Sequence, residues 1–350
     1  MTTTPALPAT PLLAITQGDS AGIGPEILAK AFRDAPGDMQ GCFVVGDLAT
    51  LRRAAQCIER PGLPSLPVAL LTEPAQALSV PPRCLPVWQL PGLPGPQPWG
   101  QVSAAAGRAA ADCVVWAARA ALRGEIAGLI TAPLHKEALH AAGVAFPGHT
   151  ELLQAEAAAH VGVALADMPV RMMLASDELR TVLVSIHVSL RDALDAVGFN
   201  NVLQTLRITH AALLRSLGRA PRMAVAGLNP HAGEGGLFGR EEIEHIAPAI
   251  AAAQALGLNV VGPLAPDTVF MRARHTAAKP GEFDVVVAMY HDQGLIPVKY
   301  LGVDKGVNVT LGLPLVRTSP DHGTAFDIAG QGLADASSLI EAVRMARKLA

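Results

Sequence analysis

Short apolar runs alternate with helix-favouring segments at the amino-terminal end, and this alternation most constrains the fold. Residues 12–16 (LLAIT) and 41–47 (GCFVVGD) are apolar runs, and residues 20–32 between them carry Pro25 and Glu26. Proline and an acidic residue are typical of a first helical turn. The order strand, helix, strand predicts a parallel sheet that is covered by helices.

The same alternation continues along most of the chain. Further strands are expected at 126–133, 222–230, 283–291 and 306–314, and further helices at about 102–123, 134–143, 190–217 and from Ala334 onward. The apolar segments 169–176 and 179–188 predict an antiparallel hairpin. The proline-rich stretch 61–100 predicts only short strands and loops.

These elements predict an α/β protein of two lobes. The expected fold has a mostly parallel sheet with helices on both faces and a second lobe with a mixed sheet. At 350 residues the chain is long enough for two lobes. We expect residues 1–135 and 312–350 in the first lobe and 136–311 in the second, with an active site in the cleft between them.

Charge and composition exclude several classes of protein. The net charge is −3 and no block of Lys or Arg is present, which argues against a nucleic-acid partner. Residues 1–11 lack the pattern of a secretion signal, and the charge-free stretch 246–266 contains prolines that favour a helix, a turn and a strand over a membrane span. The four cysteines show no CxxC spacing. We expect a soluble cytoplasmic protein with free thiols.

Three histidines stand where apolar runs meet polar loops: His187 in VLVSIHVSL, His231 in AGLNPHAGEGG and His291 in VVVAMYHDQG. A single histidine of this kind is more often a structural residue, and His187 in particular could be buried in a hairpin strand. Loops this polar are typical of the catalytic edge of an α/β sheet. Three imidazoles could therefore converge on one divalent metal and leave a position open for substrate.

A second candidate cluster is GHTE at 148–151. One interpretation is structural, with Thr150 as the N-cap of a helix and Glu151 in its first turn. The other is functional, because free N–H groups together with His149 and Thr150 would suit an anion. Both interpretations remain open.

Three basic or amide side chains lie in or beside apolar strand-like segments: Lys299, Asn308 and Arg317. An unpaired charge in such a place is costly, so an anionic partner is expected. That partner is a phosphorylated or carboxylated substrate or an internal acid. The candidate internal acids are Asp267, Asp292, Asp321 and Asp327. These acids could instead accept hydrogen bonds from metal-binding side chains and orient them.

Several long strings, taken in order, resemble the 4-hydroxythreonine-4-phosphate dehydrogenase family of vitamin B6 biosynthesis. They are GDSAGIGPE (18–26), LITAPLHKEAL (129–139), GHTE (148–151), LNPHAGEGGLFGREE (228–242), YHDQGLIPVK (290–299) and VNVTLGLPLVRTSPDHGTAFDIAG (307–330). The resemblance runs from about Leu12 to the last helix. Ser20 departs from the family, which usually has proline in this turn.

The resemblance implies a site and an assembly. The family's three metal-binding histidines fall on His187, His231 and His291, and the metal could be zinc, magnesium or cobalt. Its substrate-binding residues fall on His149, Thr150, Lys299, Asn308 and Arg317. It also implies a homodimer that shares its active sites, and a fold like that of the isocitrate and isopropylmalate dehydrogenases. Those enzymes bind dinucleotides without the G-x-G-x-x-G pattern, which the glycines at 18, 22 and 24 do not match either.

The implied reaction is the oxidation of 4-phosphooxy-L-threonine at its secondary hydroxyl by NAD or NADP, followed by decarboxylation to 3-amino-2-oxopropyl phosphate. Asp267 and Lys299 are both candidates for the general base. One alternative is a sister dehydrogenase acting on 4-phospho-threonate or 4-phospho-erythronate. A further alternative is a non-catalytic protein that binds metal or phosphate on the same scaffold.

Overall fold

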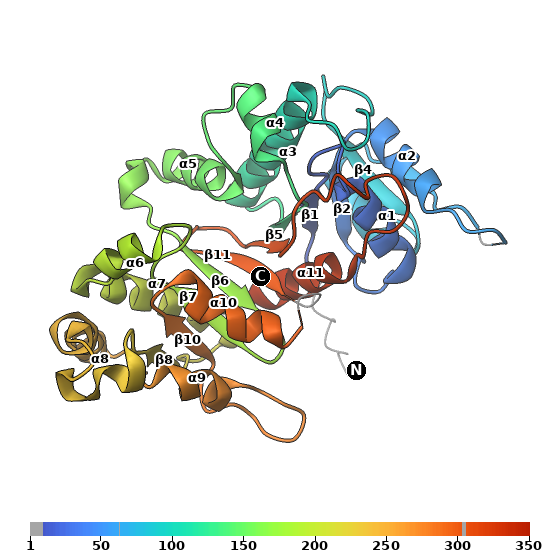
Figure 1. The fold of residues 1–350 in the computed structure, drawn as a ribbon. Helices are drawn as coiled ribbons and strands as arrows, with labels where there is room; N and C mark the ends of the chain where they lie inside the picture. Colours follow the sequence, from blue (N-terminus) through green and yellow to red (C-terminus); the bar gives the residue numbers. More distant parts are fainter. Residues whose placement is uncertain (1–9, 63, 303–305) are drawn as a thin grey trace, which may run out of the picture. The chain divides into compact units, whose positions relative to one another are not determined.

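The structure is a computed structural model that describes residues 10–62, 64–302 and 306–350. It divides into two compact units (Figure 1). Unit 1 contains the described residues up to Asp167, together with Pro314–Lys348 and Ala350. Unit 2 contains Met168–Leu313 and Leu349. Each unit is an α/β structure, which confirms the expected fold class.

Unit 1 is built on a sheet of parallel strands. Its strands, in spatial order, are β3 (Val68–Leu70), β4 (Leu85–Gln89), β2 (Cys42–Gly46), β1 (Leu13–Thr16), β5 (Gly128–Thr131) and β12 (Arg317–Pro320). The pairs β1–β2, β1–β5, β5–β12, β2–β4 and β3–β4 are all parallel. The strands β1, β2 and β5 are wholly buried, as expected for a parallel sheet covered on both faces.

The helices of unit 1 cover both faces of that sheet. They are α1 (Gly24–Asp34), α2 (Leu48–Cys57), α3 (Ala104–Leu122), α4 (Lys136–Ala141), α5 (His149–Val161) and α11 (Ser337–Leu349), with short 3-10 turns η1 (Pro74–Leu78) and η2 (Leu165–Asp167). The connection from β1 to β2 through α1 moves towards the β3 edge of the sheet. The connection from β4 to β5 through α3 moves the opposite way, towards the β12 edge. Right-handed crossovers therefore place α1 and α3 on opposite faces.

Unit 2 is built on a mixed sheet. Its strands, in spatial order, are β11 (Val307–Leu311), β6 (Arg171–Ala175), β7 (Arg180–Leu183), β10 (Val285–Ala288), β8 (Met223–Ala226) and β9 (Val260–Leu264). The pairs β11–β6 and β6–β7 are antiparallel, and the pairs from β7 through β9 are parallel. The hairpin and the mixed second sheet are thus confirmed.

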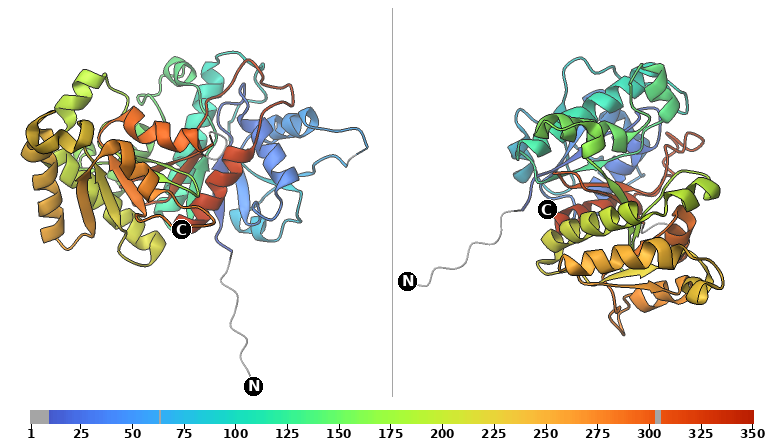
Figure 2. Two further views of the ribbon diagram at one scale, coloured as in Figure 1. Left: turned by 60° about the horizontal axis from the view of Figure 1, so that its bottom comes forward. Right: turned by 90° about the vertical axis from the view of Figure 1, so that its left-hand side faces the viewer.

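The helices of unit 2 pack in two groups. They are α6 (Leu190–Ala196), α7 (Phe199–Leu217), α8 (Ala247–Ala255), α9 (Pro266–Ala273) and α10 (His291–Tyr300), with a 3-10 segment η3 (Pro230–Gly236) and a π-helical turn η4 (Glu242–Ile246). One buried apolar cluster joins α9 and α10 to β6, β7, β8 and β10. The helices α7 and α8 lie side by side (Figure 2).

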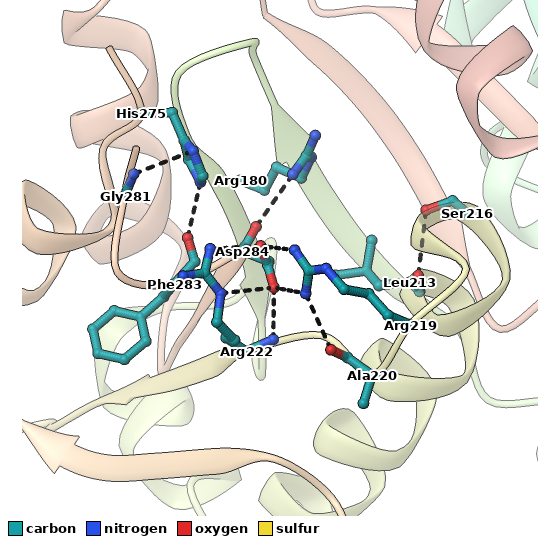
Figure 3. A network of polar contacts seen from close by, with 10 residues as sticks. All are labelled: Arg180, Leu213, Ser216, Arg219, Ala220, Arg222, His275, Gly281, Phe283 and Asp284. Atoms are coloured by element: carbon teal, nitrogen blue, oxygen red, sulfur yellow. Dashed lines mark hydrogen bonds and ion pairs between the residues drawn. The ribbon is translucent and has the colours of Figure 1, made fainter. Parts of the chain in front are cut away.

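A buried carboxylate, Asp284, links the amino ends of β8 and β10 in unit 2 through hydrogen bonds (Figure 3). Asp284, directly before β10, is only 4% exposed. Its two oxygens accept hydrogen bonds of 2.8 Å each from the guanidinium of Arg219, and one oxygen accepts from the backbone N–H of Arg222 at 2.7 Å. Burial would raise the pKa of Asp284, but the hydrogen bonds from Arg219 and Arg222 outweigh it and hold the pKa well below its usual range.

The compact units differ from the expected lobes at both boundaries, greatly at the first and by two residues at the second. The expected first lobe stops at residue 135, whereas unit 1 continues to Asp167. The reason is packing, because α4 and α5 both lie against α3. The second boundary falls after Leu313, two residues beyond the expected position.

Other local expectations have mixed outcomes. The expected helix 190–217 is two helices, α6 and α7, with Val197 and Gly198 between them. The last helix begins at Ser337 rather than Ala334. The four cysteines are free, as expected. Within the described ranges, no helix is long and apolar enough to cross a membrane.

Candidate active site

Three parallel strands of unit 2 lead into histidine-bearing segments at one edge of the sheet. The strands β7, β10 and β8 are neighbours and run in the same direction. His187 follows β7, His291 begins α10 after β10, and His231 follows β8. Because the carboxyl ends of parallel strands share one edge, the topology brings all three histidines to that edge. His187 lies in an exposed bend, so the alternative that a hairpin strand buries it is wrong.

Hydrogen bonds tie these three segments together. The hydroxyl of Ser185 donates to the carbonyl of Met289 at 3.0 Å, which links the His187 and His291 segments. Gln293 accepts from the N–H of Met289 at 2.7 Å and donates to the carbonyl of Gly227 at 2.7 Å. The side chain of Gln293 therefore links the start of α10 to the loop that carries His231.

His187 and His291 form a pair that fits a metal ion. Their ring centroids are 5.5 Å apart, and both line a pocket of about 230 Å³. Nδ1 of His291 lies 2.8 Å from Oδ1 of Asp292. A neutral His291 that donates this proton to the carboxylate presents Nε2 to a metal, which is the usual arrangement around a histidine ligand.

His231 does not complete this pair within one chain. It is exposed in η3, and its ring lies 6.2 Å from that of Phe238. Among the residues that the structure describes, no group of three or more His, Cys, Asp or Glu side chains could hold a metal ion. The site formed by three histidines therefore stays a prediction, with two of its members together here.

The two candidate bases lie in different places. Asp267 is exposed in the first turn of α9, directly after β9, and so lies at the histidine edge. Lys299 lies in the last turn of α10, eight residues after His291, which corresponds to about 12 Å along the helix. Of the two, only Asp267 is at the histidine edge of the same chain.

Asn308 also lies away from the three histidines. It pairs with Leu174, and Leu174 pairs with Thr181 in β7. Asn308 is therefore level with the second residue of β7, whereas His187 comes after that strand has ended.

A buried arginine forms a second candidate cluster, in unit 1. Arg317, at the start of β12, is 4% exposed. Its Nε and Nη2 donate to the hydroxyl of Thr131 at 3.2 and 2.7 Å. Burial lowers the pKa of Arg317 to about 10, and the carboxylate of Glu151 opposes that shift. The guanidinium is therefore charged at neutral pH.

The charge of Arg317 acts electrostatically on the nearby imidazole of His149. Burial, and then the charge of Arg317, lower the pKa of His149 well below its usual range. The imidazole is therefore neutral at pH 7, and its buried Nε2 has no hydrogen-bond partner within the described chain. A neutral ring beside a buried cation suits a site for an anionic group.

The start of α5 differs from one expectation. Its N-cap is Gly148, and the helix begins at His149, so Thr150 is not the N-cap. No side chain caps this end of α5. The residues His149 and Thr150 therefore both lie in the first turn, next to N–H groups that a substrate anion could accept from.

A further group of polar residues lies at the carboxyl ends of the strands in unit 1, near β1. Five buried polar atoms at the end of β1 and on the segments after β1, β5 and β12 have no hydrogen-bond partner among the described residues: Thr16 Oγ1, Asp19 Oδ2, Ser20 Oγ, His135 Nδ1 and His322 Nε2. The crossovers on the two sides of β1 run in opposite directions, and such a point is where open α/β sheets bind ligands. These residues fit a polar cofactor such as a dinucleotide.

Asp19 is the acidic member of this group. Its Oδ1 accepts from the N–H of Ala21 at 2.8 Å. Burial raises the pKa of Asp19, against the opposing effects of the Ala21 N–H and of His135. The ring of His135 stacks on Phe326 with centroids 4.6 Å apart.

The sequence analysis assigned no role to Asp19, His135, Thr131 or Gln293. All four lie inside strings that carry the family resemblance, so their presence there was the available signal. Thr131 and Gln293 act through contacts with Arg317 and Gly227 that lie far away in the sequence. Only the fold shows those contacts.

The comparisons with known proteins agree with one another. Residues 38–346 match the family model described as pyridoxal phosphate biosynthetic protein PdxA. A 4-hydroxythreonine-4-phosphate dehydrogenase from Beijerinckia indica subsp. indica is 51% identical and covers 96% of this chain and 94% of its own. A D-threonate 4-phosphate dehydrogenase from Salmonella typhimurium is 43% identical and covers 97% of this chain and 99% of its own.

A solved structure gives the same result. The 4-hydroxythreonine-4-phosphate dehydrogenase from Klebsiella pneumoniae has a TM-score of 0.86 and 42% identity, and covers 97% of this chain and 98% of its own. The alternative of a non-catalytic binding protein is thereby set aside. The chain belongs to the pyridoxal phosphate biosynthetic protein PdxA family and is a dehydrogenase, which implies a nicotinamide cofactor.

Proposed function

We propose that this dehydrogenase oxidises 4-phosphooxy-L-threonine at its secondary hydroxyl with NAD or NADP, and that the resulting β-keto acid loses carbon dioxide to give 3-amino-2-oxopropyl phosphate. The observation that carries the proposal is the buried, charged Arg317 beside the neutral His149. Such a pair suits an anionic substrate, and relatives that share nearly the whole chain are named for this reaction.

Arg317, His149 and Thr150 would hold the phosphate or the carboxylate of the substrate. Their contribution is orientation, because a fixed anion places the reacting carbon in one position. Lys299 and Asn308 belong to the same proposed set, although in one chain they lie away from the histidine edge of unit 2.

His187, His231 and His291 would hold a divalent cation, either zinc, magnesium or cobalt. Such a cation would polarise the oxygen atoms of the reacting group and favour loss of the hydroxyl proton. The chain supplies the orientation, because Asp292 fixes the ring of His291 and Ser185 fixes the segment that carries His187. Asp267 or Lys299 would accept the hydroxyl proton.

The nicotinamide cofactor, NAD or NADP, would accept the hydride. Asp19, His135 and His322 are the residues of unit 1 proposed to hold it, because their buried polar atoms need partners. The proposal also includes a cytoplasmic location, because NAD is present in the cytoplasm and cysteine thiols stay reduced there.

A homodimer is part of the proposal. His187 is flanked by exposed apolar side chains, among them Val188, Leu190 and Leu194, and an exposed apolar patch of this kind is typical of an interface. A second copy packed there would supply His231 of the partner subunit to the pair that one chain brings together.

The second candidate is a sister dehydrogenase for 4-phospho-threonate or 4-phospho-erythronate. Its support is the set of relatives named D-threonate 4-phosphate dehydrogenase, which are 42 to 44% identical. Those substrates carry a hydroxyl where 4-phosphooxy-L-threonine carries an ammonium group, while the phosphate and the carboxylate are common to all.

A direct assay separates the two. The purified protein is supplied with NAD or NADP, a divalent metal and each substrate in turn, and the formation of NADH or NADPH is followed by absorbance. The proposal expects the largest kcat/KM for 4-phosphooxy-L-threonine. A larger kcat/KM for D-threonate 4-phosphate would assign the second function.

A further inference from the structure

The loop that carries His231 has an unusual backbone. Six consecutive residues have positive φ: His231 (53°), Ala232 (53°), Gly233 (81°), Glu234 (42°), Gly235 (67°) and Gly236 (100°). Three of these are not glycine, and residues with a side chain rarely adopt this left-handed conformation because it brings Cβ too close to the backbone. Such a run persists only when its surroundings hold it in place.

The side chain of Glu242 supplies that support. It is 3% exposed, and it begins the π-helical turn η4. Its Oε1 accepts from the backbone N–H groups of Leu228 and Asn229, both at 2.7 Å, and its Oε2 accepts from Nδ2 of Asn229 at 2.9 Å. One carboxylate therefore fixes the two residues that lead into the left-handed run.

The surrounding glycines make room for this carboxylate. A Cβ on Gly233 would lie 2.8 Å from Oε2 of Glu242, and a Cβ on Gly227 would lie 3.2 Å from Oε1. A Cβ on Gly239 would overlap the amide of Asn229. The loop thus closes over the Glu242–Asn229 pair.

The same loop is also tied to the start of α10. Gln293 donates to the carbonyl of Gly227 at 2.7 Å, and Gly227 directly precedes Leu228, whose N–H Glu242 holds. Gln293 therefore holds the same stretch of backbone from the other side, which adds to the support that Glu242 gives to the loop.

We infer that Glu242 is a positioning residue, which acts through the strained loop to hold His231 in the orientation for binding metal. The inference rests on the proposed function, in which His231 is a metal ligand. Glu242 is buried beneath the loop and contacts its backbone, so its role is indirect. Loss of an outer partner of this kind typically weakens metal affinity by about 10- to 100-fold.

The test compares three variants of the full-length protein: Glu242→Gln, Glu244→Gln and His231→Ala. Glutamine keeps the shape of Glu242 but turns an amide N–H₂ towards the donor Nδ2 of Asn229. Glu244 is the matched control, because it lies in the same π-helical turn, with its side chain half exposed and paired with Arg240 at 2.7 Å. Zinc and cobalt affinities of the metal-free proteins are measured by calorimetry, and the absorption spectrum of the cobalt form is recorded.

The inference expects Glu242→Gln to weaken cobalt and zinc binding by about 10- to 100-fold and to alter the cobalt spectrum, while Glu244→Gln changes affinity less than about twofold. Unchanged affinity in Glu242→Gln, with binding lost in His231→Ala, would overturn the inference and leave the metal site standing. Unchanged affinity in His231→Ala would instead overturn the proposed metal site. Should Glu242→Gln fail to fold, Glu242→Asp is judged by the same criteria, because it keeps the charge but withdraws the carboxylate from the N–H groups of Leu228 and Asn229.

Discussion

The two edges of the sheet in unit 2 are built differently. At the amino edge, Asp284 is buried, and both its oxygens accept hydrogen bonds from Arg219 and Arg222 (Figure 3). At the carboxyl edge, His187 and His231 are exposed, and His231 lies in a run of positive φ angles. The strands of one sheet thus begin beside a buried ion-pair network whose carboxylate is fully hydrogen-bonded. They end in exposed polar loops, one of which has a strained backbone.

The difference shows that one sheet can place its stabilising ion pairs at one edge and its candidate ligand-binding groups at the other. A satisfied buried ion network adds rigidity but leaves nothing for a ligand to bind. Exposed imidazoles and a strained loop weaken the fold locally but place polar groups where a ligand can reach them. Substitutions at the two edges should therefore affect different measurements.

The largest effect is expected from His291→Ala. Removal of this ligand should lower kcat/KM on the order of 1,000-fold, because the polarising cation would be bound weakly or not at all. The free energy of unfolding should change by less than about 0.5 kcal/mol, since the ring is partly exposed. Steady-state kinetics and urea unfolding measure the two quantities. The control is His160→Ala at an exposed histidine of α5; similar losses in both variants would refute the assignment.

The opposite pattern is expected from Asp284→Ala. Breaking a buried ion pair typically costs about 3–5 kcal/mol, but Arg219 and Arg222 are about half exposed and can regain water. We therefore expect a loss of about 2–3 kcal/mol in the free energy of unfolding, with kcat unchanged in the folded fraction. Glu282→Gln, in an exposed pair with Arg272, serves as the control. A Glu282→Gln loss as large as that of Asp284→Ala would remove the distinction between buried and surface pairs.

Arg317→Lys tests whether unit 1 contains an anion site. Lysine keeps the charge but loses the planar donor pair, so the KM for the phosphorylated substrate should rise about tenfold. The KM for the nicotinamide cofactor should stay within about twofold. Initial-rate kinetics with each substrate varied in turn measure both constants. An unchanged KM for the phosphorylated substrate would mean that Arg317 has a structural role alone.

The smallest effect concerns the dependence of stability on pH. Because the pKa of Asp284 is lower in the folded protein than in the unfolded chain, its contribution is present above about pH 4 and is lost as the pH falls further. The difference in unfolding free energy between the natural protein and Asp284→Asn should be constant from about pH 7 to 5 and shrink below about pH 4. Urea unfolding at a series of pH values tests this. A difference that grows on acidification would contradict the sign.

Much of this architecture was predictable from the sequence, because its signals are local. The apolar runs before His187, His231 and His291 are long enough to predict strands, and parallel strands place their carboxyl ends at one edge. The charge-free stretch 246–266 is a helix, a turn and a strand, as its prolines predict.

The rest depends on contacts between distant residues. The Asp284 network joins residues 62 and 65 positions apart, and no local pattern marks such a pair. Unit 1 extends past residue 135 to Asp167 because α4 and α5 pack on α3, and that packing is tertiary. The left-handed run at 231–236 includes an alanine and a glutamate, which on their own favour other conformations. The backbone that leads into it is held by Glu242, which lies 13 and 14 residues after Asn229 and Leu228.

The central claim is that the histidine edge of unit 2 binds a divalent cation, and crystals of the enzyme grown with zinc test it most directly. Anomalous scattering should show one strong peak between the rings of His187 and His291, with His231 of the partner subunit as the third ligand. No peak there, or a peak elsewhere on the chain, would contradict the account.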